Sequence, residues 1–202
     1  MTDRKMTQTP SQTIGPFFAY CLTPEQYGRN GIAGNVMAGP QTKGQHIRIT
    51  GRLIDGEGGP MDDALIEVWQ ANAAGRYASP ADARDGVPLD PTFKGFGRCK
   101  TDKEGRFTFD TVKPGRVPGQ GNRLQAPHVS VIIHSRGMLS HACSRIYFSD
   151  EAEANAEDPV LSSVEAARRP TVIARREDTP GGPVYHLDIH MQGERETVFF
   201  DA

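Results

Sequence analysis

The chain has 202 residues, 37% of them hydrophobic, and a formal net charge of −2 at pH 7. This length allows one large domain, and the near-neutral charge gives no reason to expect a nucleic-acid partner. The apolar runs are far shorter than the ~20 residues that span a bilayer, so we expect no membrane segment.

The start of the chain and the cysteines bear on location. Met1 to Pro10 is polar and lacks the apolar core of a secretory signal. The cysteines, Cys21, Cys99 and Cys143, are odd in number and widely spaced. They predict reduced thiols in a cytoplasmic protein rather than a disulfide framework or a zinc site.

The first 44 residues predict an arm followed by a long loop. A polar start leads into Thr13-Ile-Gly-Pro-Phe-Phe-Ala-Tyr20, where the Gly-Pro pair disfavours a helix. An irregular segment that is rich in aromatic residues packs either on its own domain or on a partner chain. The residues themselves leave both possibilities open.

From residue 46 onward, apolar and polar residues alternate in short segments that are separated by turn residues. At least seven or eight strands and one helix, Asp150 to Ala167, are expected. The expected strands are 46–55, 64–70, 106–112, 128–134, 142–148, 172–176, 184–191 and 197–200. This pattern predicts an all-β fold: an antiparallel β-sandwich that forms one domain over residues 1–202, with one short helix and long loops.

A loop rich in proline and glycine, Lys113 to Ser130, leads into one of these strands. Loops of this kind often build sites. Residues 128 and 130 of a strand lie on one face, about 6.6 Å apart, so two histidines there could bind one metal ion. The chain has His128 but Ser130, and a serine hydroxyl is a poor ligand beside an imidazole. His186 and His190 are too far apart on a strand to share a metal.

Four segments together carry a specific resemblance: Leu65-Ile-Glu-Val-Trp-Gln-Ala71, Gly75-Arg-Tyr77, Phe96-Gly-Arg98 and Thr111-Val-Lys-Pro-Gly115. They resemble the intradiol ring-cleaving dioxygenases over nearly the whole chain. The resemblance implies a β-sandwich fold. It also implies a ferric ion held by two tyrosines and two histidines, which binds a catechol dianion and opens its ring to attack by O2.

Matched position by position, only two of the four iron ligands are present. Tyr77 matches the first tyrosine and His128 the first histidine, whereas Val117 stands at the second tyrosine and Ser130 at the second histidine. Gln125 stands where the family pattern has an arginine. The resemblance therefore implies that this chain has no metal ligand set and no catalytic residue of its own, and that these positions are vestigial.

One branch of the family pairs an iron-bearing chain with a related chain that lacks a working iron site, and the sequence resembles the second kind. Further matches are Thr9 to Phe17, Ser149 to Ala156 and Gln192 to Phe200. The resemblance implies Fe(III) in a partner chain, and protocatechuate (3,4-dihydroxybenzoate) and O2 as substrates. The ring is cut between the two hydroxyl-bearing carbons, which gives 3-carboxy-cis,cis-muconate.

The same resemblance implies a role for the arm. Residues 1–44 are expected to pack on the iron-bearing partner chain. The residues expected to line the substrate pocket at that interface are Thr13, Gly15, Pro16, Phe17 and Arg136. A guanidinium is well suited to the substrate carboxylate, although a turn arginine can equally be a solvated charge.

Two alternatives remain at this stage. The chain could be a self-sufficient dioxygenase for a catechol or hydroxyquinol if His134, His141 or Tyr147 supplied the missing ligands. It could also be a β-sandwich carrier or interaction module without enzymatic activity. Metal analysis of the lone chain distinguishes the first, and the identity of a co-purifying partner distinguishes the second.

Overall fold

The computed structural model describes residues 12–15 and 18–201. Two of the expected pocket residues, Pro16 and Phe17, lie outside the described residues. The eleven strands are β1 (His46–Ile54), β2 (Leu65–Trp69), β3 (Phe96–Lys100), β4 (Arg106–Val112), β5 (Val117–Pro118), β6 (Leu124–Gln125), β7 (His128–His134), β8 (Ala142–Phe148), β9 (Ile173–Thr179), β10 (Gly182–His186) and β11 (Ile189–His190). The α-helices are short: α1 (Ala19–Leu22), α2 (Ala152–Glu157) and α3 (Pro159–Ser163).

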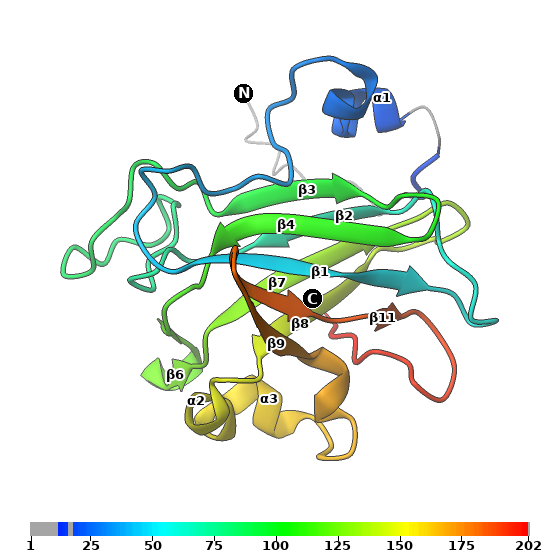
Figure 1. Ribbon diagram of the computed structural model, residues 1–202. Coiled ribbons are helices and arrows are strands. Elements are labelled where there is room, and N and C mark those ends of the chain that lie inside the picture. Colours follow the sequence, from blue (N-terminus) through cyan, green and yellow to red (C-terminus); the bar gives the residue numbers. More distant parts are fainter. Residues whose placement is uncertain (1–11, 16–17, 202) are drawn as a thin grey trace, which may run out of the picture.

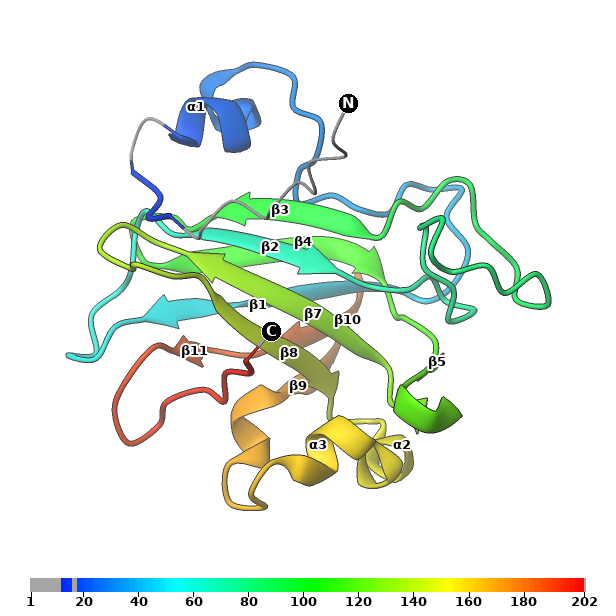
Figure 2. The same ribbon diagram turned by 180° about the vertical axis from the view of Figure 1, so that it is seen from behind.

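Nine strands form one curled sheet, and the all-β prediction is confirmed. The order runs β4-β1-β10-β9-β8-β7-β2-β3, with β11 also paired to β1. The two end strands, β3 and β4, lie near each other, so the sheet almost closes into a sandwich-like shape (Figures 1 and 2). Most pairs are antiparallel, but β1–β10, β1–β11 and β8–β9 are parallel. The chain passes through α2 and α3 before β9, and such a crossover permits a parallel pair.

The core lies inside this curled sheet, and the period-two pattern explains it. Ile47, Ile49 and Leu53 of β1 are buried, and so are Phe107 and Phe109 of the neighbouring β4. Burying a side chain of this size contributes roughly 1.5–3 kcal/mol each. The apolar residues that alternate along β1 and β4 are therefore the ones that the structure buries.

The expected helix over 150–167 is two short helices. Asp158, between α2 and α3, has extended backbone angles and accepts hydrogen bonds from the backbone N–H groups of Val160 and Leu161. Pro159 follows it and has no N–H to continue α2. The break is therefore a proline stop combined with an N-cap. None of the helices among the described residues could span a membrane.

Two other differences concern the C-terminal strands. The expected strand 184–191 is interrupted at Leu187 and Asp188, and its two halves, β10 and β11, both pair with β1. The expected strand 197–200 is reduced to one isolated bridge between Cys143 and Phe200.

The N-terminal region divides into two parts. Residues 34–38 bridge the ends of the sheet: Gly34 accepts a backbone hydrogen bond from Arg98 of β3, and Asp110 of β4 bonds to residues 35, 37 and 38. This part belongs to the domain itself. The preceding part, with α1 and the 3-10 turn Pro24–Tyr27, stands above β3 as a separate lobe (Figure 1).

Candidate functional site

Two glycines place Tyr77 beside Val117. A Cβ on Gly75 would lie 2.1 Å from the carbonyl oxygen of Arg116, and a Cβ on Gly115 would lie 2.6 Å from the backbone nitrogen of Gly75. Gly75 also has φ +81°, which disfavours any other residue. The Gly-Arg-Tyr and Lys-Pro-Gly segments are therefore in direct backbone contact, and only glycine permits this approach.

Tyr77 is half-buried in an aromatic and charged environment. Its ring stacks on Trp69 with a centroid distance of 5.9 Å, and its backbone N–H donates to Asp82, which is paired with Arg84. Tyr77 and Val117 line one open hollow of about 400 Å³. Burial raises the pKa of Tyr77, against the opposing charge of Arg145. Tyr77 is therefore a neutral phenol in this chain.

His128 and Ser130 share one face of β7, as expected. His128 is 4% exposed, and its Nδ1–H donates to the carbonyl oxygen of Ala126 at 2.8 Å. Burial, together with the positive charge of Arg145, lowers the pKa of His128 to about 4. Ser130 pairs with Trp69 on one side and with Arg145 on the other. The structure thus brings the four vestigial positions around one place.

Arg145 of β8 is the residue of this site that the sequence reading missed. Its Nη1 donates to Oε1 of Gln125 at 2.6 Å and lies 3.4 Å from the hydroxyl of Tyr147. Gln125 itself pairs with Val117 across the small β5–β6 hairpin. One feature of the sequence could have indicated Arg145. Gln125 stands where the family pattern has an arginine, and this loss is a reason to look for another arginine on a neighbouring strand.

Asp158 is a second residue that sequence reasoning missed. It is fully buried and accepts hydrogen bonds from the backbone N–H of Ala126 at 2.7 Å and from the hydroxyl of Tyr147 at 3.2 Å. The same carboxylate caps α3. Asp158 therefore ties the helical crossover to the loop that carries His128.

The residues of this site do not fit a ferric ion. Val117 has no donor atom, Ser130 offers only a neutral hydroxyl, and the guanidinium of Arg145 adds a positive charge. In the part of the chain that the structure describes, no group of three His, Cys, Asp or Glu residues could hold a metal.

The replacement ligands considered above are also badly placed. Tyr147 is close to His128, but its hydroxyl bonds to Asp158 and Arg145, and burial raises its pKa, which opposes a phenolate. His134 lies at the other end of β7, about 20 Å along the strand from His128, with His141 beside it. The histidines therefore cannot complete the ligand set.

Of the expected interface residues, the three that the structure describes lie at a second place, where the arm meets the β7–β8 turn: Thr13, Gly15 and Arg136. The hydroxyl of Thr13 donates to the carbonyl oxygen of Ser135 at 3.3 Å. The next residue, Arg136, pairs through Nε with Asp63 at 2.8 Å and keeps 65% of its side chain exposed. The arm thus lies beside the Arg-Gly turn.

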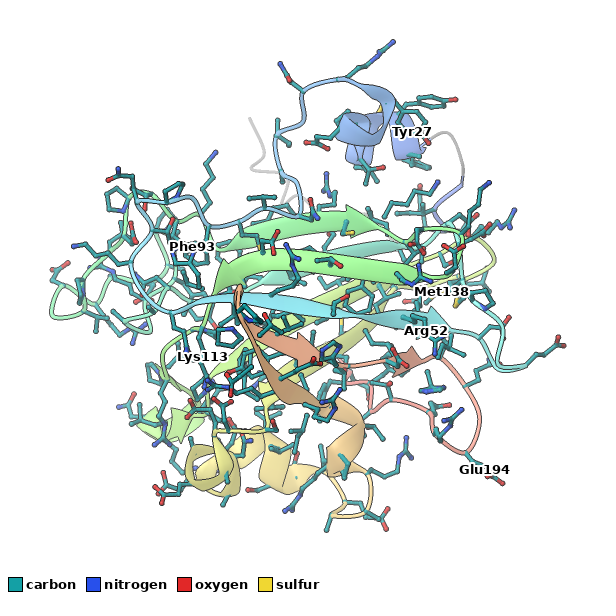
Figure 3. All side chains as sticks on the ribbon, in the orientation of Figure 1. Tyr27, Arg52, Phe93, Lys113, Met138 and Glu194 are labelled. Carbon is teal, nitrogen blue, oxygen red and sulfur yellow. The ribbon has the colours of Figure 1, made fainter. Side chains whose placement is uncertain are left out.

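A cavity of about 210 Å³ separates the arm from the edge of the sheet, and Gly15, Phe18, Asp63 and Lys100 are among its lining residues. Figure 3 labels Tyr27 in the arm lobe and Met138 in the β7–β8 turn. Several large apolar side chains of these two segments are exposed: Phe18, Tyr20, Tyr27, Ile32 and Leu139. The region can therefore offer a cation and an apolar surface to another molecule.

Comparison with known proteins shows the family to which the chain belongs. A family model described as Dioxygenase matches residues 15–193. The chain is 46% identical to the protocatechuate 3,4-dioxygenase alpha chain of Burkholderia cepacia, over 98% of both chains. It belongs to the intradiol dioxygenase family. Within this family it is also 41% identical to the alpha chain of Pseudomonas putida, over 97% of both chains.

The family likeness extends to a beta chain and to solved structures. The chain is 37% identical to the protocatechuate 3,4-dioxygenase beta chain of Burkholderia cepacia, covering 82% of this chain and 72% of that one. An intradiol ring-cleavage dioxygenase from Tetranychus urticae shares the fold, with a TM-score of 0.60 and 20% identity over 92% of this chain and 94% of that one. The dioxygenase domain of a carbohydrate-binding fusion from Streptomyces sp. SirexAA-E does so with a TM-score of 0.61 and 18% identity, over 96% of this chain and 98% of that one.

Proposed function

We propose that the chain is the alpha subunit of a protocatechuate 3,4-dioxygenase and works in a hetero-oligomer with an iron-bearing beta subunit. One observation carries the proposal: the chain matches alpha chains over its full length, and its own site has Val117 and Ser130 where the family pattern has ligands. An enzyme of this family without a ligand set needs a second chain that has one. The three free cysteines are consistent with a cytoplasmic enzyme.

The interface would form where the arm meets the β7–β8 turn. Phe18, Tyr20 and Tyr27 are 40–55% exposed and Leu139 is 88% exposed. Aromatic residues are enriched in the buried centre of protein–protein interfaces, so these exposed side chains favour a contact with another chain. Thr13 and Gly15 stand on the same side, and we assign them, together with Pro16 and Phe17, to the rim of the partner's substrate pocket.

Arg136 is the residue that we assign to the substrate carboxylate. Asp63 binds its Nε at 2.8 Å and Asp62 lies 3.9 Å from its Nη2, which holds the guanidinium at the base of the turn while most of the side chain stays exposed. A guanidinium has five N–H donors, so an aromatic carboxylate could bind to the remaining ones. Fe(III) in the beta subunit would activate the bound catecholate toward O2, and this chain would orient the ring and exclude water from one side of the pocket.

Expression of the chain alone, of the beta subunit alone and of both together tests the proposal. We expect the lone chain to be colourless, free of stoichiometric iron and inactive. We expect the co-expressed pair to purify as one complex that absorbs in the visible range and cleaves protocatechuate. Stoichiometric iron and activity in the lone chain would contradict the proposal, and so would the failure of the two chains to form a complex.

A further inference from the structure

Arg145 lies beside the four positions that match the family's iron ligands. It lies across from Ser130 on the adjoining strand, and residues directly opposite in a sheet have Cβ atoms about 4.5–5.5 Å apart. Its guanidinium bonds to Gln125, whose strand partner is Val117, and approaches Tyr147, whose ring is 5.9 Å from that of His128. Ser130 thus lies directly opposite Arg145, and only one intervening residue separates Arg145 from Val117 and from His128.

The charge of Arg145 reaches the fourth position as well. It is the largest charge–charge influence on the pKa of Tyr77 and also on that of His128. The guanidinium therefore lies within electrostatic reach of both surviving ligand positions, one on each side of the site. In the active members of the family, the pattern requires a metal cation between these same two positions.

Arg145 is held in this place without an acidic partner. Its side chain is half-buried, and no carboxylate among the described residues lies within ion-pair distance. Its Nη1 donates instead to the amide oxygen of Gln125 at 2.6 Å. Gln125 replaces the arginine of the family pattern, so the site has lost one guanidinium at position 125 and has another from β8.

We propose that the guanidinium of Arg145 takes the place of the metal cation in this chain and, in addition to the loss of ligands at Val117 and Ser130, excludes iron from the site. A fixed positive charge in a half-buried site opposes a ferric ion because like charges at short range repel strongly when water screening is weak. The site is therefore closed to metal by two independent changes. The proposal concerns only this chain's own site and does not depend on its role as a subunit.

Restoring the ligands tests the proposal directly. The variant Val117→Tyr/Ser130→His is compared with two triple variants that add Arg145→Gln or Arg145→Lys, all in the full chain. Iron is supplied as ferrous salt in air, and bound iron is measured by metal analysis and by visible absorption. A matched control adds Arg175→Gln, which removes an arginine with 69% side-chain exposure on β9.

We expect stoichiometric iron and visible absorption only in the variant with Arg145→Gln. The variant with both ligands restored, the Arg175 control and the Lys variant should bind no more iron than the parent chain. Iron in the variant that keeps Arg145 would overturn the proposal. Iron in the Lys variant would show that size rather than charge excludes the metal, and absence of iron from a folded Gln variant would show that Arg145 is not the barrier.

Folding of each variant is checked by circular dichroism and cooperative thermal unfolding. If the Gln variant fails to fold, a crystal structure of the parent chain in its complex decides the matter. The guanidinium of Arg145 should then be found between Tyr77 and His128. A side chain turned away from them, with water or an ion in that space, would contradict the proposal.

Discussion

Asp158 offers a sharp test of how the site loop is held. Replacing it by alanine removes the N-cap of α3, which costs about 1 kcal/mol. It also leaves two buried donors, the N–H of Ala126 and the hydroxyl of Tyr147, without their acceptor, at about 1–2 kcal/mol each. Asp158→Ala should therefore lower the free energy of unfolding by about 3–5 kcal/mol in total.

Asp158→Asn should have a smaller effect, about 1–3 kcal/mol, because its amide oxygen can still cap α3. The remaining loss arises because the amide N–H₂ group is a donor and would face the N–H of Ala126, which is a donor as well. Urea unfolding of the full chain, followed by circular dichroism, measures both values. Glu157→Gln is the matched control: this neighbour is 66% exposed and should change stability by less than about 0.5 kcal/mol. A loss below about 1 kcal/mol for Asp158→Ala would refute the reasoning.

Three further predictions concern the interface and the acid stability. Deleting residues 1–18 should raise KM for protocatechuate or prevent assembly with the beta subunit; steady-state kinetics and size-exclusion chromatography measure this, and unchanged values would contradict the role of the arm. Arg136→Gln should lower kcat/KM for protocatechuate by roughly 10–100-fold, the equivalent of one charge-assisted hydrogen bond, but leave turnover of unsubstituted catechol unchanged; an equal loss on both substrates would contradict a contact with the carboxylate. Asp150, although burial opposes it, has its pKa lowered to about 2 by hydrogen bonds from Lys113 and Arg176. The stability that these hydrogen bonds contribute is therefore present above about pH 4 and is lost as the pH falls from about 4 to about 2. Asp150→Asn should flatten that part of the stability curve, whereas the exposed Asp85→Asn should not; an unchanged curve for Asp150→Asn would contradict the assignment.

The network behind the last prediction connects distant parts of the fold. Lys113 bonds to Asp150 at 2.8 Å, its ammonium group lies over the rings of Phe148 and Tyr185, and Arg176 of β9 also pairs with Asp150. The start of the Lys113–Ser130 loop is thus anchored to the beginning of the helical crossover. A loop without metal ligands still needs such anchors to keep its shape.

Much of the fold could be predicted because short-range patterns determine it. Alternation identified β1, β2, β4, β7 and β8. The single helix over 150–167 was wrong in detail because the cap at Asp158 competes with helix continuation before Pro159. The parallel pairing of β1 with β10 and of β8 with β9 was missed because pairing partners depend on contacts far apart in sequence, which periodicity does not report.

The site could be predicted only in part. The glycines at 75 and 115 and the ligand positions at 77, 117, 128 and 130 are local motifs, and the structure gathers them in one place. Arg145 could not be found from its own segment, because its meaning depends on which residue lies across the strand pair. The same holds for Asp158, whose two most important partners are at positions 126 and 147.

The position of iron in the assembled enzyme tests the central claim most directly. Crystals of the complex with the beta subunit, measured with X-rays at the iron absorption edge, locate every bound iron ion. We predict a single iron peak in each alpha–beta pair, in the beta subunit and facing Arg136 and the arm of this chain. An iron peak between Tyr77 and His128 of this chain, or a peak in the beta subunit far from Arg136, would contradict the account.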